Sequence, residues 1–134
     1  MTRPRILVDM SGTLIHHGHI RLLRAAAAMG DVIVGLSTDS EINAHKGYLP
    51  ELNYLERSEI IESFSFVSEV HPAPWIITED FLASLSCDFL AHGEDNFNTV
   101  RADRVILLPR TVGVSSTEIR IRAAQILKIQ RGLT

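Results

Sequence analysis

Cysteine is nearly absent from this chain of 134 residues, because only Cys87 occurs, and an intrachain disulfide is excluded. Such a protein is expected in a reducing compartment, and the cytoplasm is the expected location. Long apolar runs are absent too. The run at residues 6–8 ends at Asp9, too early for a secretory signal, and no run approaches the roughly 18 apolar residues of a membrane span. Membrane insertion is therefore not expected.

An excess of positive charge is also missing. The chain has 13 Lys and Arg residues against 16 Asp and Glu residues, which gives a formal net charge of -3. This balance does not favour a nucleic acid as partner. With 46% hydrophobic and 22% charged residues, the composition is that of a globular protein. The length suits a single domain that spans residues 1–134.

Short apolar runs alternate with longer helical patterns along the chain, which is typical of a parallel sheet with crossover helices. Strands are expected at residues 5–8, 32–37, 66–70, 89–91 and 105–108. Helices are expected at residues 18–29, 54–64, 79–85 and 116–130, and loops at 43–52 and 93–102. The predicted fold is α/β and Rossmann-like, with three α/β/α layers around a five-stranded parallel sheet.

Three histidines gather directly after the first expected strand, in the sequence His16-His17-Gly18-His19. His16 and His19 are three residues apart, so both can face one side of the first helical turn, where backbone N–H groups and the helix dipole favour an anion. Gly18 leaves room for a polyphosphate to approach the backbone. The cluster indicates a phosphate site, while a histidine metal site and a solvated helix cap remain open alternatives.

A second polar cluster follows the last expected strand and opens the last helix. An arginine, several hydroxyl groups and a second set of helix N-terminal amides suit the same kind of anion. A plain helix cap beside a surface arginine is the alternative. The candidate ligand-binding residues here are Arg110, Thr111, Gly113, Ser115, Ser116 and Thr117.

The two clusters together indicate more than either does alone. In a parallel sheet, the first and last strand-to-helix loops can both open at the carboxyl edge, so both clusters can hold one long polyanion. A nucleoside triphosphate is the natural candidate. Neither the P-loop pattern nor G-x-G-x-x-G occurs, which argues against a P-loop hydrolase and a standard dinucleotide dehydrogenase.

The ordered pair His16-x-Gly18-His19 and Arg110-Thr-x-Gly-x-Ser-Ser-Thr117 resembles the cytidylyltransferases of the HxGH nucleotidyltransferase type, most of all those acting on glycerol 3-phosphate. The resemblance implies transfer of CMP from CTP to a short phosphorylated polyol, such as glycerol 3-phosphate, with a CDP-alcohol and pyrophosphate as products. It also implies a cytoplasmic homodimer that supplies cell-surface polymer biosynthesis. The apolar residues of the last helix exceed one narrow stripe, which suits a subunit interface.

The resemblance further implies roles for individual residues. The catalytic residues are His16, His19 and Arg110. The nucleotide site also includes Ser11, Gly12, His17 and Asp39 besides the two clusters. The acceptor-binding residues are Lys46, Arg57 and Trp75. Mg²⁺ is expected on the nucleotide phosphates rather than in a cage of protein ligands.

The chain departs from the family pattern at four positions. Thr13 stands where an aspartate is usual, Ser65 and Ser68 replace an arginine and an aspartate, and Thr78 lies where a lysine is expected. Two alternatives therefore stay open. One is an ATP-dependent adenylyltransferase that acts on a sugar phosphate or similar acceptor. The other is a nucleotide-binding module without catalytic activity.

Overall fold

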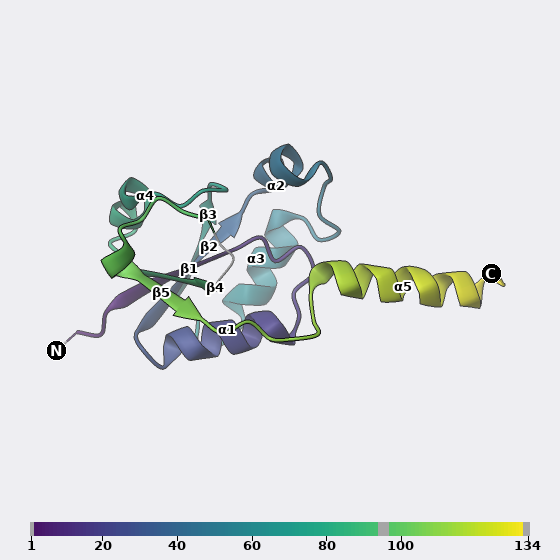
Figure 1. Cartoon of the computed structure of the whole chain (residues 1–134), viewed down its shortest axis with the longest axis horizontal. Helices are drawn as coiled ribbons and strands as arrows, with labels where there is room; N and C mark the ends of the chain where they lie inside the picture. The colour runs from purple at the N-terminus through teal and green to yellow at the C-terminus, as the bar shows by residue number, and fades with distance from the viewer. Residues whose placement is uncertain (1, 94–96, 133–134) are drawn as a thin grey trace.

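The computed structural model describes residues 2–93 and 97–132, and Figure 1 shows the whole chain. Part of the expected loop at residues 93–102, including Glu94 and Asp95, lies outside the described residues. Five parallel strands make one sheet in the spatial order β3-β2-β1-β4-β5. They are β1 (Arg5–Met10), β2 (Asp31–Ser37), β3 (Glu69–Ala73), β4 (Phe89–Gly93) and β5 (Val105–Leu108).

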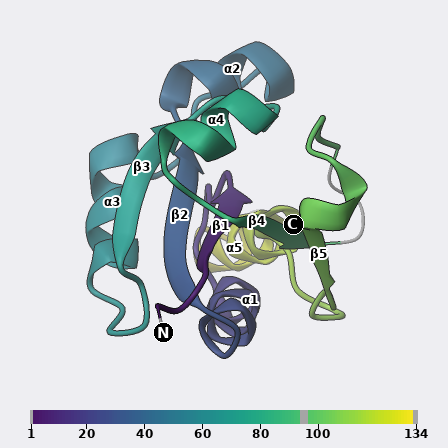
Figure 2. The same ribbon diagram turned by 90° about the vertical axis from the view of Figure 1, so that its left-hand side faces the viewer.

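Helices cover both faces of this sheet. Helices α1 (His17–Ala27) and α3 (Tyr54–Glu62) lie on one face, and α4 (Glu79–Ser84) lies on the other (Figure 2). Each face has its own apolar core, with Leu23 of α1 and Ile61 of α3 in one and Leu82 of α4 in the other. The predicted α/β fold with three layers and a five-stranded parallel sheet is confirmed.

The order of the strands places the natural ligand crevice at β1. The chain moves from β1 outward through β2 to β3, then crosses back so that β4 pairs with the other side of β1. Parallel sheets of this kind bind ligands outside the carboxyl ends of the strands, at the point where the strand order reverses. The loops after β1, β4 and β5 all leave from this edge.

One helix was not predicted. Helix α2 (Asp39–Lys46) begins at the Thr38 cap, whose side chain accepts from the Glu41 N–H, and ends at Gly47 in the left-handed conformation. Residues 43–46 therefore belong to a helix rather than to the expected loop at 43–52. The apolar pattern could not reveal this helix, because Ile42 is the only side chain that α2 buries.

The third strand lies three residues later than predicted. Residues 66–70 are apolar enough for a strand, but Phe66 stacks on Phe64 and packs against the core beside α3. Strand β3 instead contains Pro72, which an edge strand tolerates because one row of its backbone groups needs no partner in the sheet. The other strands agree with the predicted ranges to within two residues.

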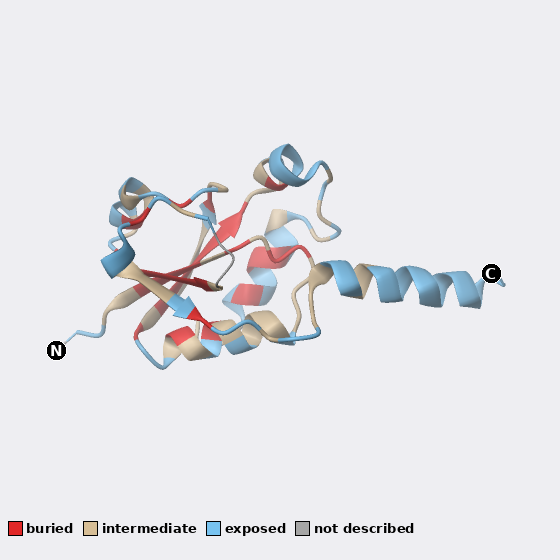
Figure 3. Ribbon diagram, in the orientation of Figure 1, coloured by how far each residue is buried: buried red, intermediate tan, exposed pale blue. Residues whose placement is uncertain are grey.

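Helix α5 (Ser116–Gln130) projects away from the sheet, as Figure 1 shows. None of its side chains is buried, and most are exposed, including Ile126 and Ile129 (Figure 3). A short 3-10 turn, η1 (Ala102–Arg104), precedes β5. No helix among residues 2–93 and 97–132 has both the length and the apolar content that crossing a bilayer requires.

Candidate active site

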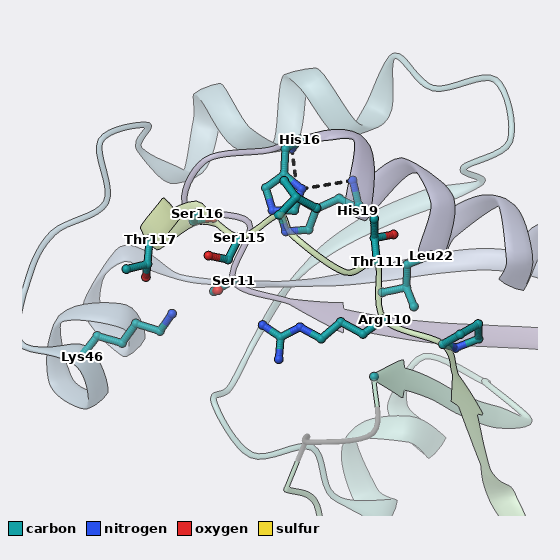
Figure 4. Close-up of a pocket in the computed structure, with 14 residues that line it drawn as sticks. Ser11, His16, His19, Leu22, Lys46, Arg110, Thr111, Ser115, Ser116 and Thr117 are labelled. Atoms are coloured by element: carbon teal, nitrogen blue, oxygen red, sulfur yellow. Dashed lines mark hydrogen bonds between the residues drawn. The ribbon is translucent and has the colours of Figure 1, made fainter. Parts of the chain in front are cut away.

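The amino-terminal tips of α1 and α5 meet at the carboxyl edge of the sheet and enclose a cavity of about 270 Å³ (Figure 4). Its lining contains nearly all of the residues predicted to bind phosphate. These are Ser11, directly after β1, then His16, Gly18 and His19 of the first cluster, and Arg110, Thr111, Ser115, Ser116 and Thr117 of the second. The structure therefore brings together the two clusters, about 90 residues apart in the sequence, around one space.

His16 is the cap of α1 as well as a wall of this cavity. Its Nδ1 accepts a hydrogen bond from the Gly18 N–H at 3.1 Å. Because Nδ1 is the acceptor, a neutral imidazole carries its proton on Nε2. Burial, together with the nearby charges of His17 and Arg110, lowers the pKa of His16. At neutral pH, His16 is thus an uncharged donor at Nε2.

His19 completes the same cap, because its side chain binds the backbone of His16. Its Nδ1 accepts from the His16 N–H at 3.1 Å, which makes the pair a reciprocal capping box. The two rings lie 4.0 Å apart between centroids. Burial above all, and then repulsion from His16, lowers the pKa of His19 to about 4. His19 therefore also presents Nε2–H as a donor at neutral pH.

Gly18 is required by the imidazole beside it. A Cβ at this position would lie 2.8 Å from Cε1 of His16 and 3.2 Å from Cγ1 of Val114 on the other helix tip. The ring could move away only by giving up its cap bond to the Gly18 N–H. The absent side chain thus allows the two tips to approach, in addition to the room for phosphate predicted from the sequence.

The positive groups of the cavity come from two sides. The side chains of Arg110 and Lys46 point toward one another across it, Arg110 from the end of β5 and Lys46 from the last turn of α2 (Figure 4). Two neutral imidazole donors and two cations around one space suit a ligand with several negative charges.

Side-chain hydrogen bonds hold the second helix tip against the first. Ser116 Oγ donates to the Leu14 carbonyl at 3.1 Å and accepts from the Leu14 N–H at 3.4 Å. Ser115 caps α5 by accepting from the Glu118 N–H at 3.1 Å. The oxygen of each serine thus has a structural task, while the hydroxyl proton of Ser115 is available to a ligand.

A second cavity, of about 550 Å³, adjoins the first, because Ser11, Lys46 and Gly93 line both. Trp75, predicted at the acceptor, forms part of its wall. The His45 ring stacks on the Trp75 ring at 5.0 Å between centroids, and Lys46 Nζ lies 5.7 Å from the centre of the same ring. Lys46 therefore stands at the junction of the two spaces.

Arg57 does not line either of these cavities, contrary to the role at the acceptor that the sequence predicts. Its side chain is 0% exposed. It donates to the carbonyls of Ser11, Ser37 and Leu52 at 2.6, 2.8 and 2.9 Å, and to Asp39 Oδ1 at 2.7 Å. Arg57 thus joins the ends of β1 and β2 to the start of α2, and it acts as a scaffold beneath the site.

Asp39 is explained by the same contact. Its carboxylate pairs with Arg57, and it is not among the residues that line the two cavities. The predicted role of Asp39 at the nucleotide or its Mg²⁺ therefore does not fit this geometry. A carboxylate directly after a strand looked like a ligand, because the sequence could not show that a buried arginine 18 residues later needs an anion.

Three further predicted residues lie beside the first cavity rather than in its lining. Gly12 and Gly113 have φ of +53° and +82°, so both are needed for the shape of the loops. His17 is exposed, with its ring against the edge of His16.

Some residues that line the second cavity were not predicted from the sequence as ligand-binding residues. In the second cavity they include Asp9, His45 and Phe97. Asp9 directly follows an apolar run and is the one member that strand position could have indicated. His92, considered from the sequence as a nucleotide contact, also lies there. It is buried, and its Nε2 meets Asn98 Nδ2 at 2.9 Å.

A protein-held metal has little support in this part of the chain. Among residues 2–93 and 97–132, no group of three or more His, Cys, Asp or Glu side chains could hold a metal ion. The Nδ1 atoms of His16 and His19 are moreover engaged with backbone N–H groups. Because each Nδ1 accepts an N–H, the proton of each neutral ring is on Nε2, so neither ring offers a metal ion a lone pair in this arrangement.

Comparison with known proteins identifies relatives of two kinds. The sequence profile described as Cytidylyltransferase-like matches residues 13–122. An ethanolamine-phosphate cytidylyltransferase of Dictyostelium discoideum is 39% identical over 129 residues, covering 86% of this chain and 35% of that protein. A glycerol-3-phosphate cytidylyltransferase of Staphylococcus aureus is 37% identical over 122 residues, covering 87% of this chain and 92% of that protein. The chain thus spans about a third of the ethanolamine-phosphate relative.

A solved structure shares the fold. The lipopolysaccharide core biosynthesis protein from Thermoplasma volcanium superposes with a TM-score of 0.61, covering 98% of this chain and 90% of that one. At 17% sequence identity, this likeness concerns the fold alone.

Replacing Arg57 should destabilise the whole protein. We expect Arg57→Met to lower the free energy of unfolding by about 2–4 kcal/mol, because three backbone carbonyls and one carboxylate lose a charged donor. Urea unfolding at neutral pH measures the change. The matched control is Arg101→Met, since Arg101 pairs with Asp103 on the exposed surface and its loss should cost less than about 1 kcal/mol. Equal losses in the two variants would refute the scaffold role.

Acid should destabilise the protein through His19. The unfolded chain takes up this proton near pH 6.5, whereas the folded chain takes it up only near pH 4, the lowered pKa of His19. The contribution of neutral His19 to the free energy of unfolding is therefore complete above about pH 6.5 and is lost as the pH falls toward 4. Urea unfolding at about pH 7.5 and about pH 5 measures the slope.

The control for this slope is His19→Asn, whose amide oxygen can still accept from the His16 N–H but does not titrate. This variant should lose less stability than the wild type between the two pH values. The same loss in both proteins would show that His19 is not the group responsible.

Proposed function

The chain belongs to the cytidylyltransferase-like family, as its two motifs predicted, and we propose that it transfers CMP from CTP to a short phosphorylated alcohol. The products are a CDP-alcohol and pyrophosphate. The observation that carries this proposal is the single cavity between two helix tips, with His16, His19 and Arg110 in its lining, open toward a second cavity at Lys46.

The reaction needs alignment and charge stabilisation rather than a general base. A phosphate oxygen of the acceptor, already anionic at neutral pH, forms a bond to the α-phosphorus of CTP. The bond from that phosphorus to the bridging oxygen breaks, and its electron pair leaves with pyrophosphate. The Nε2–H groups of His16 and His19 and the guanidinium of Arg110 suit the charge that builds up on these oxygens.

Mg²⁺ is proposed to bind with the nucleotide. The described residues that line the first cavity offer histidine, arginine, lysine and hydroxyl groups but no carboxylate, which does not suit a cation held by these residues alone. Oxygens of the triphosphate are the ligands that Mg²⁺ prefers, and the bound ion would neutralise part of their charge.

The second cavity is proposed as the acceptor site. Lys46 at the junction suits the acceptor phosphate, because from there it can reach the space next to the α-phosphate. The rest of a short acceptor would lie against Trp75. The second cavity suits the short phosphorylated polyol that the motifs favour as acceptor. Glycerol 3-phosphate is the first candidate.

Phosphoethanolamine is the second candidate, and Asp9 is the observation that favours it. The Asp9 carboxylate lies in the lining of the second cavity, where it could bind an ammonium group as well as a hydroxyl group. The aromatic ring of Trp75 in the same wall also suits a cation. The relative of Dictyostelium discoideum is an ethanolamine-phosphate cytidylyltransferase, which supports the same choice.

The two alternatives from the sequence are less well supported. An ATP-dependent adenylyltransferase would share the histidine motif, but the family and the curated relatives described above are cytidylyltransferases. An inactive nucleotide-binding module would have no need for two oriented imidazole donors next to a lysine from a second cavity.

A homodimer, a cytoplasmic location and a role in cell-surface polymer biosynthesis remain part of the proposal. Helix α5 supports the homodimer, because Ile121, Ile126 and Ile129 are exposed on a helix without buried side chains. The single cysteine, buried and free, supports a reducing compartment.

Removing one imidazole donor tests the chemistry. With CTP, Mg²⁺ and a panel of phosphorylated alcohols, His19→Ala should lower kcat for pyrophosphate release about 100-fold or more, which is typical for the loss of one oriented transition-state donor. The exposed Arg21, on the same helix but not in the lining, provides the control Arg21→Ala, which should stay close to the wild type. ATP replaces CTP in a parallel series. Release at the same rate by His19→Ala and the wild type would contradict the mechanism, and faster release with ATP would reverse the choice of nucleotide.

Replacing Asp9 tests the acceptor. If the acceptor carries an ammonium group, Asp9→Asn should raise KM for phosphoethanolamine about tenfold or more, because a charge-assisted hydrogen bond becomes a neutral one. KM for glycerol 3-phosphate should change much less, since an amide still bonds to hydroxyl groups. The wild type assayed with both acceptors at saturating CTP gives the reference. If the wild type does not turn over phosphoethanolamine, the acceptor is not phosphoethanolamine and the polyol phosphate stays the candidate.

A further inference from the structure

The tip of α5 carries part of the triphosphate site, yet apolar packing does not hold it in place. Helix α5 has no buried side chain, and it projects from the body of the protein (Figure 1). Ser116 joins it to Leu14 through two hydrogen bonds, one of which is long at 3.4 Å. The position of the tip relative to His16 and His19 must therefore depend on further polar contacts of its first two turns.

Arg120, in the second turn of α5, supplies these contacts. Its Nη2 donates to Thr13 Oγ1 at 2.7 Å and to Glu51 Oε1 at 2.7 Å, and its Nε donates to Glu51 Oε2. The guanidinium also lies over the ring of Tyr48, 5.0 Å from its centre. One side chain of α5 thus binds two other segments of the chain.

Each of these segments leads to a different part of the site. Thr13 is buried in the loop that runs from β1 to His16. Tyr48 and Glu51 belong to the connection that follows Lys46 and leads to α3. Arg120 itself is three residues beyond Thr117. Thr117 is in the lining of the first cavity. The guanidinium therefore connects the histidine loop, the triphosphate tip and the segment next to the lysine at the acceptor cavity.

We propose that Arg120 is a positioning residue for the transfer reaction, which holds the α5 tip against the histidine loop through Thr13 and against the Lys46 segment through Glu51. This inference rests on the proposed function for its kinetic consequences, but the contacts and their structural test do not. Arg120 touches neither of the two cavities, and it acts through the elements that it holds together.

The chemistry of the three partners explains why an arginine is suited to this position. A carboxylate takes two parallel N–H donors, and a hydroxyl oxygen in another direction takes a third contact, which the planar guanidinium can offer at once and a lysine ammonium cannot. Thr13 differs here from the aspartate usual in the family, but its hydroxyl keeps an acceptor at this point of the loop.

The Glu51 contact is stable in the neutral pH range. The hydrogen bond from Arg120 is the main cause that lowers the pKa of Glu51, so this carboxylate is ionised well below neutral pH. Both side chains are partly exposed, at 23% for Arg120 and 45% for Glu51. An ion pair so close to solvent adds little to global stability. The loss of Arg120 should therefore act on local geometry and leave the fold intact.

Steady-state kinetics separate the Thr13 contact of Arg120 from its Glu51 contact. Arg120→Met should raise KM for both CTP and the acceptor and lower kcat/KM for CTP about tenfold or more, because small displacements of reacting groups are costly. Thr13→Val, which has the same shape without the hydroxyl, should raise KM for CTP only. Thr13→Ser restores the acceptor oxygen and should recover most of the loss. The control is Arg122→Met, an exposed arginine on the same helix.

Amide hydrogen exchange gives a readout that does not depend on activity. The amides of residues 119–122 close the first turns of α5, as the 3.1 Å bond from the Ile119 N–H to the Ser115 carbonyl shows. In Arg120→Met these amides should exchange about tenfold faster than in the wild type or in Arg122→Met, while the amides of strands β1 and β2 stay protected. Thr13→Val should show the same effect and Thr13→Ser should not.

The possible outcomes distinguish the positioning role of Arg120 from the proposed function. Unchanged exchange at residues 119–122 in Arg120→Met would overturn the positioning role, and so would unchanged KM values in an active enzyme. A wild type that releases no pyrophosphate with any acceptor would overturn the proposed function. In that case, faster exchange in Arg120→Met and Thr13→Val, but not in Thr13→Ser, would still support Arg120 as the residue that holds the α5 tip.

Discussion

The site depends on the capping box in which His16 and His19 satisfy the first backbone N–H groups of α1. The same two hydrogen bonds that begin the helix occupy Nδ1 of each ring. They leave each Nε2 as the proton donor, and burial keeps the rings uncharged by lowering both pKa values. Helix formation and donor orientation are therefore one event. A chain that folds α1 correctly has also prepared the two imidazoles for an anionic ligand, without any further side chain to orient them.

The second half of the site is attached to the first by polar contacts rather than by a core. Ser116 binds the backbone of Leu14, and Gly18 allows Val114 to come close to α1. The sheet beneath is rigid, with Ile6, Val8 and Val34 fully buried, and Arg57 ties the ends of two strands to α2. The result is a firm carboxyl edge that carries one helix tip directly and the other through hydrogen bonds, which is the arrangement expected where ligands are bound and released.

Much of this arrangement could be predicted from the sequence, because local signals and tertiary contacts agree there. The alternation of apolar runs gave the parallel sheet, and the two polar clusters predicted the cavity where the tips of α1 and α5 meet. Helix α2 was missed because Ile42 alone is buried, so no amphipathic pattern exists. Arg57 and Asp39 were assigned to ligands because a sequence does not show whether a charged side chain points into a pocket or toward backbone carbonyls 20 or 46 residues away.

The ion pair of Arg57 and Asp39 also determines where α2 begins, and this helix carries Lys46. Arg57 fixes the start of α2 at Asp39, and Lys46 is on the last turn of the same short helix. The start of α2 is thus set from beneath, while its last turn contacts Trp75, whose ring stacks on His45 and lies 5.7 Å from Lys46 Nζ. The walls of the second cavity come from several segments, with Asp9 from β1, His45 and Lys46 from α2, and Trp75 after β3. A substitution in those walls can therefore also move Lys46, because the helix that carries it is part of them.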